Sequence, residues 1–248
     1  MLKGKRILIT GAARGLGYAF AESAIEAGAR VVVADILKER GEEAAKVLSV
    51  RGEAHFVELD LANPDSITAC ADTAAQKLGG LDGLINNGAL ATGVGGKTLD
   101  EYDIELFDRV LTVNVRGTWL MTRAALSHFK QAGAGRVVNL ASDTALWGAP
   151  RLIAYVASKG AVISMTRSMA RELGDFKVTV NAIAPGLTKV EATEYVPKDR
   201  HDLYETGRAI SRAQYPEDIT GAVNFLLSDA AGFITGQLLP VNGGFVFN

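Results

Sequence analysis

Tyr155 and Lys159 are the residues whose types and spacing most directly suggest chemistry. If the run around them is helical, the two side chains lie one turn apart on one face, with a rise of about 6 Å between them. A phenol titrates near ~10 in water, but a neighbouring cation favours the phenolate and lowers the phenol pKa. The pair could therefore transfer a proton. Alone, the spacing is more typical of a half-buried aromatic and a solvated lysine, so other parts of the chain must support the chemistry.

Ser142 is a second candidate for the same site. It ends the apolar run 135–142, which predicts a strand, and it precedes Tyr155 by 13 residues. Open α/β sheets bind their ligands outside the carboxyl ends of the strands. A loop after Ser142 followed by a helix over about 151–174 would bring the hydroxyl and the phenol to the same edge of a sheet.

A glycine-rich turn predicts a binding site for a dinucleotide. Gly11, Gly15 and Gly17 lie between a predicted strand at 6–10 and a helical pattern at 18–27. Glycines allow the backbone to approach a pyrophosphate, and the helix N-terminus offers free N–H groups and a partial positive charge. The strand before and the helix after meet the structural requirement of this motif.

Asp35 and Arg14 point to different coenzymes. Asp35 ends the next predicted strand, 30–35, and its carboxylate can accept hydrogen bonds from the adenosine ribose of NAD while repelling the 2′-phosphate of NADP. Arg14 lies in the glycine-rich turn, where a guanidinium could bind that phosphate. We favour NAD. Asp35 could also be the N-cap of a helix over 37–50, and both roles can coexist.

The remaining elements alternate between strand and helix at intervals of roughly 25 residues, which predicts βαβ units, a parallel sheet and a single domain over 1–248. Further strands are predicted at 54–59, 81–88, 178–184 and 236–241, and further helices at 38–50, after Asn63, at 99–131 and at 216–227. Asn114 and Gly117 are poor helix formers within the long helix and indicate a kink, close packing or a functional amide. We expect 93–97 to be a loop near the strand ends and 187–210 to be a mobile segment over the site.

Composition excludes several classes of function. The net charge is -2 with no basic block, which gives no support to nucleic-acid or membrane binding. Cys70 is the only cysteine and the three histidines are far apart, so we expect no catalytic metal. No apolar run approaches the ~18 residues of a membrane span, and no signal peptide is evident. We expect a cytoplasmic protein.

The pattern as a whole resembles the short-chain dehydrogenase/reductase family in its single-domain form of about 250 residues. The resemblance covers essentially the whole chain and is carried by Gly11–Gly17, Asp60-Leu61, Asn86-Asn87, Asn114-Val115-x-Gly117, Ser142, Tyr155-x-x-x-Lys159 and Pro185-Gly186. It implies an α/β, three-layer, doubly wound fold of the Rossmann type, with seven parallel strands and helices on both faces. It also implies oxidation of an alcohol or reduction of a ketone with NAD or NADP, and a homotetramer.

The resemblance further implies roles for single residues. Tyr155 would be the general acid/base, Lys159 would lower its pKa and hold the nicotinamide ribose, Ser142 would orient the substrate oxygen, and Asn114 would hold a water in a proton relay. The implied coenzyme contacts are Gly11, Arg14, Gly15, Leu16, Gly17, Asp35, Asp60, Leu61, Asn87, Tyr155, Lys159, Pro185, Gly186 and Thr188.

Two departures from the family pattern concern the backbone. The order Asn87-Gly88-Ala89 replaces the usual Asn-Ala-Gly, and Asn242 stands where an aspartate often precedes the final Gly-Gly. The alternatives are an NADP-dependent 3-oxoacyl carrier-protein reductase, a sugar-nucleotide epimerase and a nucleotide-binding protein without turnover.

The expected substrate is a compact secondary alcohol or ketone. The candidate pocket residues are Leu90, Ala91, Thr144, Ala145, Trp147, Leu152, Leu187 and the segment 190–204. Trp147 could instead be a packing residue of the loop.

Overall fold

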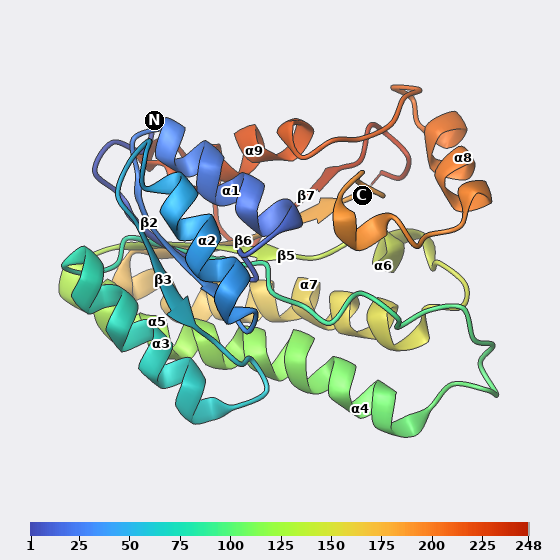
Figure 1. The fold of residues 1–248 in the computed structure, drawn as a ribbon, viewed down its shortest axis with the longest axis horizontal. Coiled ribbons are helices and arrows are strands. Elements are labelled where there is room, and N and C mark those ends of the chain that lie inside the picture. Colours follow the sequence, from blue (N-terminus) through green and yellow to red (C-terminus); the bar gives the residue numbers. More distant parts are fainter. Residues whose placement is uncertain (248) are drawn as a thin grey trace.

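The structure is a computed structural model that describes residues 1–247. Seven strands form one all-parallel sheet in the order β3-β2-β1-β4-β5-β6-β7 (Figure 1). The strands are β1 (Arg6–Thr10), β2 (Arg30–Asp35), β3 (Ala54–Glu58), β4 (Gly83–Asn86), β5 (Gly135–Leu140), β6 (Val178–Pro185) and β7 (Leu238–Val241). The predicted doubly wound fold with seven parallel strands is confirmed.

Helices cover both faces of the sheet because successive strand residues point to opposite sides. Ile7 and Ile9 of β1 pack with α1, α2 and α9 in one apolar cluster, whereas Leu8 packs with α3, α5 and α7 in another. Figure 1 shows these two helical layers above and below the sheet. The helices are α1 (Gly15–Glu26), α2 (Lys38–Leu48), α3 (Pro64–Leu78), α4 (Ile104–Leu111), α5 (Gly117–Ala132), α6 (Thr144–Trp147), α7 (Ile153–Leu173), α8 (Lys198–Gly207) and α9 (Glu217–Leu227).

The long helix predicted over 99–131 is wrong in its start and its continuity. It begins at Ile104, because the Asp103 side chain accepts a hydrogen bond from the Leu106 N–H at 2.7 Å and caps the first turn. A π-helical turn, Thr112–Arg116, then separates α4 from α5. Asn114 lies in that turn, which accounts for a poor helix former at this position.

The segment 187–210, called the substrate segment below, has defined secondary structure. It contains a 3-10 turn at Glu191–Thr193 and helix α8. Strands β3, β4, β5 and β7 are shorter than predicted, and α2 ends at Leu48. Cys70 lies in α3 and is buried.

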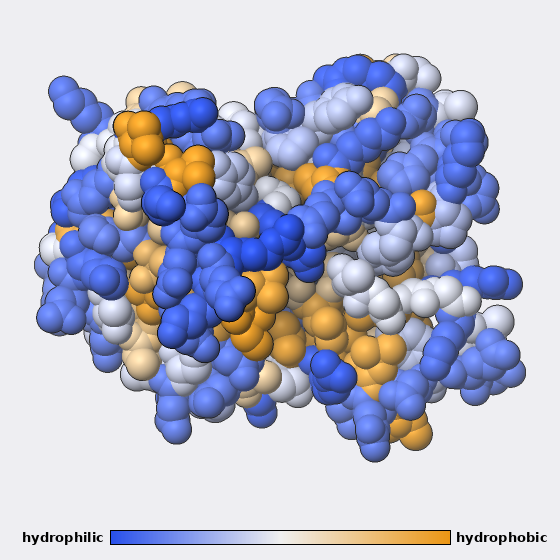
Figure 2. Space-filling model, viewed as in Figure 1, coloured by the Kyte–Doolittle hydropathy of each residue, from blue (hydrophilic) through white to orange (hydrophobic). Residues whose placement is uncertain are grey.

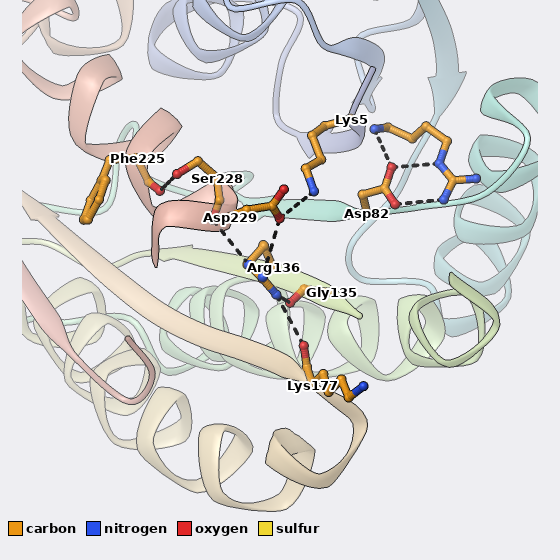
Figure 3. A network of polar contacts seen from close by, with 9 residues as sticks. Lys5, Asp82, Gly135, Arg136, Lys177, Phe225, Ser228 and Asp229 are labelled. Carbon is orange, nitrogen blue, oxygen red and sulfur yellow. Dashed lines mark hydrogen bonds and ion pairs between the residues drawn. The ribbon is translucent and has the colours of Figure 1, made fainter. Parts of the chain in front are cut away.

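The two edges of the sheet differ in character. The strand order reverses between β1 and β4, so their carboxyl ends form the crevice where doubly wound sheets bind ligands. At the amino ends, ion pairs join neighbouring elements (Figure 3).

Within residues 1–247, no helix has both the length and the hydropathy needed to cross a bilayer.

Candidate active site

The residues predicted to do chemistry come together at the carboxyl end of β5. Ser142 follows that strand by two residues, and Tyr155 and Lys159 lie in the first two turns of α7. The Lys159 Nζ donates a 2.6 Å hydrogen bond to the Leu140 carbonyl oxygen and lies 5.6 Å from the centroid of the Tyr155 ring. The last residues of β5 thus fix the ammonium next to the phenol.

Burial shifts both titratable groups toward their neutral forms. Desolvation raises the pKa of Tyr155 to about 12, against the lowering effect of a hydrogen bond with Ser142. Desolvation also lowers the pKa of Lys159 to about 8. Perturbed pairs of this kind gather at catalytic sites, because water is excluded from the place where charge must move.

Asn114 uses its side chain to connect three parts of the site. Its Oδ1 accepts a 2.7 Å hydrogen bond from the Leu90 N–H, and its Nδ2 donates to the Leu90 carbonyl at 3.2 Å and to the Ser158 Oγ at 3.1 Å. The Asn114 carbonyl accepts from the Thr118 hydroxyl at 2.8 Å. The side-chain amide therefore ties the loop after β4 to α7 beside Lys159.

The glycine-rich turn fits a pyrophosphate. Gly11 has a φ of 64°, and a Cβ on it would lie 2.5 Å from the Gly88 Cα, so only glycine is accommodated. At Gly15 the nearest atom to a Cβ would be Val190 at 3.9 Å, so that backbone face is open. The first turn of α1 has no side-chain cap from Arg14. Open backbone at an uncapped helix N-terminus binds anions, and Leu16 and Gly17 lie in that turn.

Asn87 holds the glycine-rich turn against the end of β4. Its Nδ2 donates to the carbonyl oxygens of Thr10 at 3.0 Å and of Gly11 at 2.9 Å. Gly88 is not among the positive-φ residues, and a Cβ on it would lie 2.8 Å from the Leu61 Cδ1. The departure from the usual Asn-Ala-Gly order therefore leaves ordinary backbone after Asn87 and allows closer packing.

Asp35 and Asp60, the two carboxylates predicted to contact the adenosine half of a dinucleotide, lie at the end of β2 and shortly after β3. Asp35 is buried, its Oδ2 accepts from the Ala13 N–H and its Oδ1 from the Leu37 N–H, both at 3.0 Å. Each oxygen keeps capacity for a ribose hydroxyl. The N-cap of α2 is Leu37, so Asp35 is not the capping residue. The Asp60 Oδ1 accepts from the Ala62 N–H at 2.8 Å.

The chain after β6 reaches the same edge of the sheet. Pro185 ends β6, the Gly186 N–H donates to the Val241 carbonyl at 3.3 Å, and the buried Thr188 donates its hydroxyl to the Gly186 carbonyl at 3.0 Å. Asn242 also stabilises its turn, because its Oδ1 accepts from the Gly244 N–H at 3.0 Å. These residues border the site next to Ser142.

The substrate segment contacts the loops after β4 and β5 through Tyr195 and Tyr204, which lie within the predicted pocket segment 190–204. The Tyr195 hydroxyl donates to the Ala91 carbonyl at 2.8 Å, and its proximity contributes to the raised pKa of Tyr155. The Tyr204 hydroxyl donates to Asp143 Oδ1 at 2.8 Å, and burial raises the pKa of Asp143 to about 6. In the sequence, the only indication that Asp143 belongs to the site is its position directly after Ser142.

Trp147 is a packing residue of this covering layer. Its Nε1 donates to the Tyr204 hydroxyl at 3.1 Å, and its ring meets the Tyr204 and Phe245 rings edge-on. On the other side, Leu90 and Leu152 pack with Tyr155 in an apolar cluster. Figure 2 shows hydrophobic side chains gathered in a hollow in the middle of the face of the molecule that it draws.

Within residues 1–247 no group of three or more histidine, cysteine or acidic side chains could hold a metal ion.

Comparisons with known proteins agree with this geometry. Residues 11–246 match the sequence family described as enoyl-(acyl carrier protein) reductase. The chain is 38% identical over 245 residues to the 3-alpha-(or 20-beta)-hydroxysteroid dehydrogenase of Mycobacterium tuberculosis, covering 99% of this chain and 90% of that protein. It is 35% identical over 251 residues to the cyclopentanol dehydrogenase of a Comamonas species, covering 98% of each.

A solved structure extends the similarity to three dimensions. The 3-ketoacyl-(acyl-carrier-protein) reductase of Brucella melitensis, complexed with NADH, superimposes with a TM-score of 0.91 at 34% identity, covering 100% of both chains. The fold, the placement of Ser142, Tyr155 and Lys159, and these similarities show that the chain belongs to the short-chain dehydrogenase/reductase family, whose members interconvert alcohols and carbonyl compounds with a nicotinamide coenzyme.

Proposed function

We propose that the protein is an NAD-dependent oxidoreductase that interconverts a small secondary alcohol and its ketone. The observation that carries the proposal is the convergence of Ser142, Tyr155 and Lys159 at the carboxyl end of β5, beside a glycine-rich turn that accommodates a pyrophosphate. The nicotinamide would supply the chemistry of accepting or returning a hydride. Asp35 supports NAD over NADP because its buried carboxylate would face the adenosine ribose.

The protein side chains would handle the proton. In alcohol oxidation, Ser142 holds the substrate oxygen and Tyr155 takes its proton as the C–H hydride leaves; in ketone reduction, Tyr155 returns the proton. The cation of Lys159, close to the Tyr155 ring, favours the phenolate that this step requires, and the ammonium can also bind ribose hydroxyls. Asn114 would hold a water of the proton relay to Lys159, and its hydrogen bond to Ser158 fixes it beside α7.

An apolar skeleton, such as that of a cyclic secondary alcohol, suits the substrate side of the cleft. Leu90 and Leu152 form an apolar wall beside Tyr155, and two relatives are named for a hydroxysteroid and for cyclopentanol. A second candidate is an NADP-dependent 3-oxoacyl carrier-protein reductase, because the Brucella neighbour is named as a 3-ketoacyl-(acyl-carrier-protein) reductase, although that structure holds NADH. Rates with secondary alcohols and with 3-oxoacyl thioesters, each measured with both coenzymes, distinguish the two.

A cytoplasmic homotetramer is part of the proposal. Its support from the surface is the exposure of large apolar side chains on two faces: Trp119 on α5, and Phe233 and Phe247 near the C-terminus. Exposed aromatic groups of this size are typical of association surfaces. Sedimentation of the purified protein tests it, and a monomer would contradict it.

Replacing Tyr155 with phenylalanine tests the proposed chemistry. Tyr155→Phe removes only the hydroxyl, so turnover should fall by about 10²–10⁴-fold, the range for loss of a general acid/base, while the affinity for NADH stays within about twofold. Turnover is read at the nicotinamide absorbance and affinity by NADH titration. Tyr215→Phe, at an exposed tyrosine, is the matched control and should retain full activity. A Tyr155→Phe variant with unchanged turnover would contradict the mechanism.

A further inference from the structure

Glu191 of the substrate segment binds two arginines that flank the proposed coenzyme site. Its Oε1 accepts from Arg14 Nη1 at 2.8 Å and from Arg40 Nη1 at 2.9 Å, and its Oε2 accepts from Arg40 Nη2 at 3.1 Å. Arg14 lies at the start of α1 in the glycine-rich turn, and Arg40 lies in the first turn of α2. One carboxylate thus connects the two helix N-termini that follow β1 and β2.

The three side chains lie at the adenosine end of the site. Asp35 ends β2, and Arg40 lies in the first turn of the helix that follows that strand. Val190, next to Glu191, is the nearest neighbour of the open face of Gly15. In Figure 2 hydrophilic side chains cross the middle of this face above the hydrophobic hollow. A 2′-phosphate on the adenosine ribose would therefore arrive among Asp35, Arg14, Arg40 and Glu191.

We propose that Glu191 is a coenzyme-specificity residue, which excludes a 2′-phosphate by occupying Arg14 and Arg40 from the substrate segment. The proposal rests on the proposed use of a nicotinamide dinucleotide. Guanidinium groups are the usual partners of a phosphate, but here Arg14 Nη1 and both Nη atoms of Arg40 already donate to a carboxylate of the same chain. NADP would have to displace Glu191 and place its phosphate near two carboxylates, whereas the 2′-hydroxyl of NAD meets neither obstacle.

Selectivity, and not stability, is the quantity that these ion pairs control. The side chains of Arg14, Glu191 and Arg40 are 38%, 42% and 52% exposed, and exposed ion pairs contribute little to folding. Like-charge repulsion and occupied donors nevertheless discriminate between two ligands that differ by one phosphate. If Glu191 only tied the substrate segment in place, its loss would affect both coenzymes equally.

The test compares the dissociation constants of NADH and NADPH, measured by nicotinamide fluorescence titration without substrate. Glu191→Gln keeps the shape of the side chain and removes its charge. We expect it to tighten NADPH binding by about tenfold, the order expected from charge-assisted hydrogen bonds freed at a partly exposed site, while NADH binding stays within about twofold. Glu42→Gln, at an exposed glutamate of α2 two residues after Arg40, should change neither constant. The gain should shrink in high salt.

A second background shows whether the arginines mediate the effect. In Arg14→Gln, Arg40→Gln protein, the further change Glu191→Gln should no longer improve NADPH binding, because the freed donors are absent. An unchanged ratio of the two constants in Glu191→Gln, or a gain that persists without the arginines, would overturn the proposal. These outcomes are separate from the proposed function, which fails if the wild-type protein binds neither dinucleotide or prefers NADPH.

Discussion

Tyr155 and Lys159 are both held in surroundings that disfavour their charged forms. Burial is the dominant cause in each case, raising the pKa of Tyr155 to about 12 and lowering that of Lys159 to about 8. Burying the Lys159 ammonium, with its hydrogen bond to the Leu140 carbonyl, lowers the stability of the folded protein relative to an apolar side chain at the same position. Such a cost is expected where a charge is kept for catalysis rather than for stability.

The cost of Lys159 should be visible in the pH dependence of stability. Its folded-state pKa lies below the ordinary value of about 10.4, so between pH 8 and that value the unfolded chain binds a proton that the folded protein does not. The stability of the wild type relative to Lys159→Met should therefore be lowest below about pH 8 and should rise with pH through this window.

Urea denaturation of the two proteins at several pH values from 7 to 10.5 measures this difference. Lys77→Met, at an exposed lysine of α3, reports the effect of removing a solvated charge. The Lys159→Met variant should also lose turnover. A stability difference that does not change with pH would show that the Lys159 ammonium remains solvated.

Among the elements, the π-helical turn Thr112–Arg116 has the most direct effect on the site. One extra residue in the turn lets Asn114 point inward to Leu90 and Ser158 while α4 and α5 continue along the sheet. Gly117 follows at once and packs on the turn after β3, where a Cβ would lie 2.9 Å from the Leu61 carbonyl oxygen and 3.0 Å from its Cβ. The same contact positions Leu61 next to Gly88.

The contact at Gly117 can be tested by comparing two glycine-to-alanine variants that should change the free energy of unfolding in opposite directions. Glycine to alanine within a helix normally stabilises by about 0.4–1 kcal/mol. Gly221→Ala in α9, where a Cβ would meet nothing within 4 Å, should follow that rule. Gly117→Ala should instead destabilise, because the Leu61 backbone must move. Thermal and urea denaturation measure the change in the free energy of unfolding for both variants. A stabilised Gly117→Ala protein would show that the packing of Gly117 on Leu61 is loose.

Across the whole molecule, the two edges of the sheet serve different purposes. The carboxyl edge holds the site, and the amino edge holds ion pairs (Figure 3). Arg6 and Asp82 join the starts of β1 and β4, and Lys5 and Arg136 join the starts of β1 and β5 to Asp229 in the turn after α9. The Arg6–Asp82 pair there is bidentate: the Arg6 Nε donates to Asp82 Oδ2 and the Nη2 donates to Oδ1, both at 2.8 Å. Although desolvation raises the pKa of Asp82, the hydrogen bonds from Arg6 hold it below its usual value.

Asp82→Asn should therefore destabilise the protein in a pH-dependent way. We expect a loss of about 1–3 kcal/mol at pH 7, the usual cost of leaving a partly buried charged group without its partner. Because the folded-state pKa of Asp82 is lowered, its contribution is present above the ordinary value of about 3.9 and disappears as the pH falls through the folded-state value.

Denaturation of wild type and Asp82→Asn at pH 7 and at about pH 2.5 measures the effect, with Asp108→Asn at an exposed aspartate of α4 as control. Activity should be unaffected at neutral pH, since the pair lies at the edge opposite the site. A destabilisation of equal size at both pH values would mean that the carboxylate charge is not responsible.

Much of this architecture is predictable from the sequence because it depends on local patterns. β1 and β2 were predicted residue for residue, since buried parallel strands are short apolar runs with clear breaks at Gly11 and after Asp35. Tyr155 and Lys159 share a helix, so their spacing alone predicts their juxtaposition. The start of α4 was missed because capping by Asp103 depends on the geometry of one side chain.

Only the tertiary structure decided which residues far apart in the chain come into contact. The sequence by itself determined the alternation of strands and helices, the glycine-rich turn after the first strand and the chemical identity of the site residues. It left Asp35 and Arg14 as opposed arguments about the coenzyme. The fold brings Glu191 to Arg14 across 177 positions, and Tyr204 to Asp143 across 61. No local pattern marks such partners, because exposed charges and aromatics are common and only packing determines which of them meet.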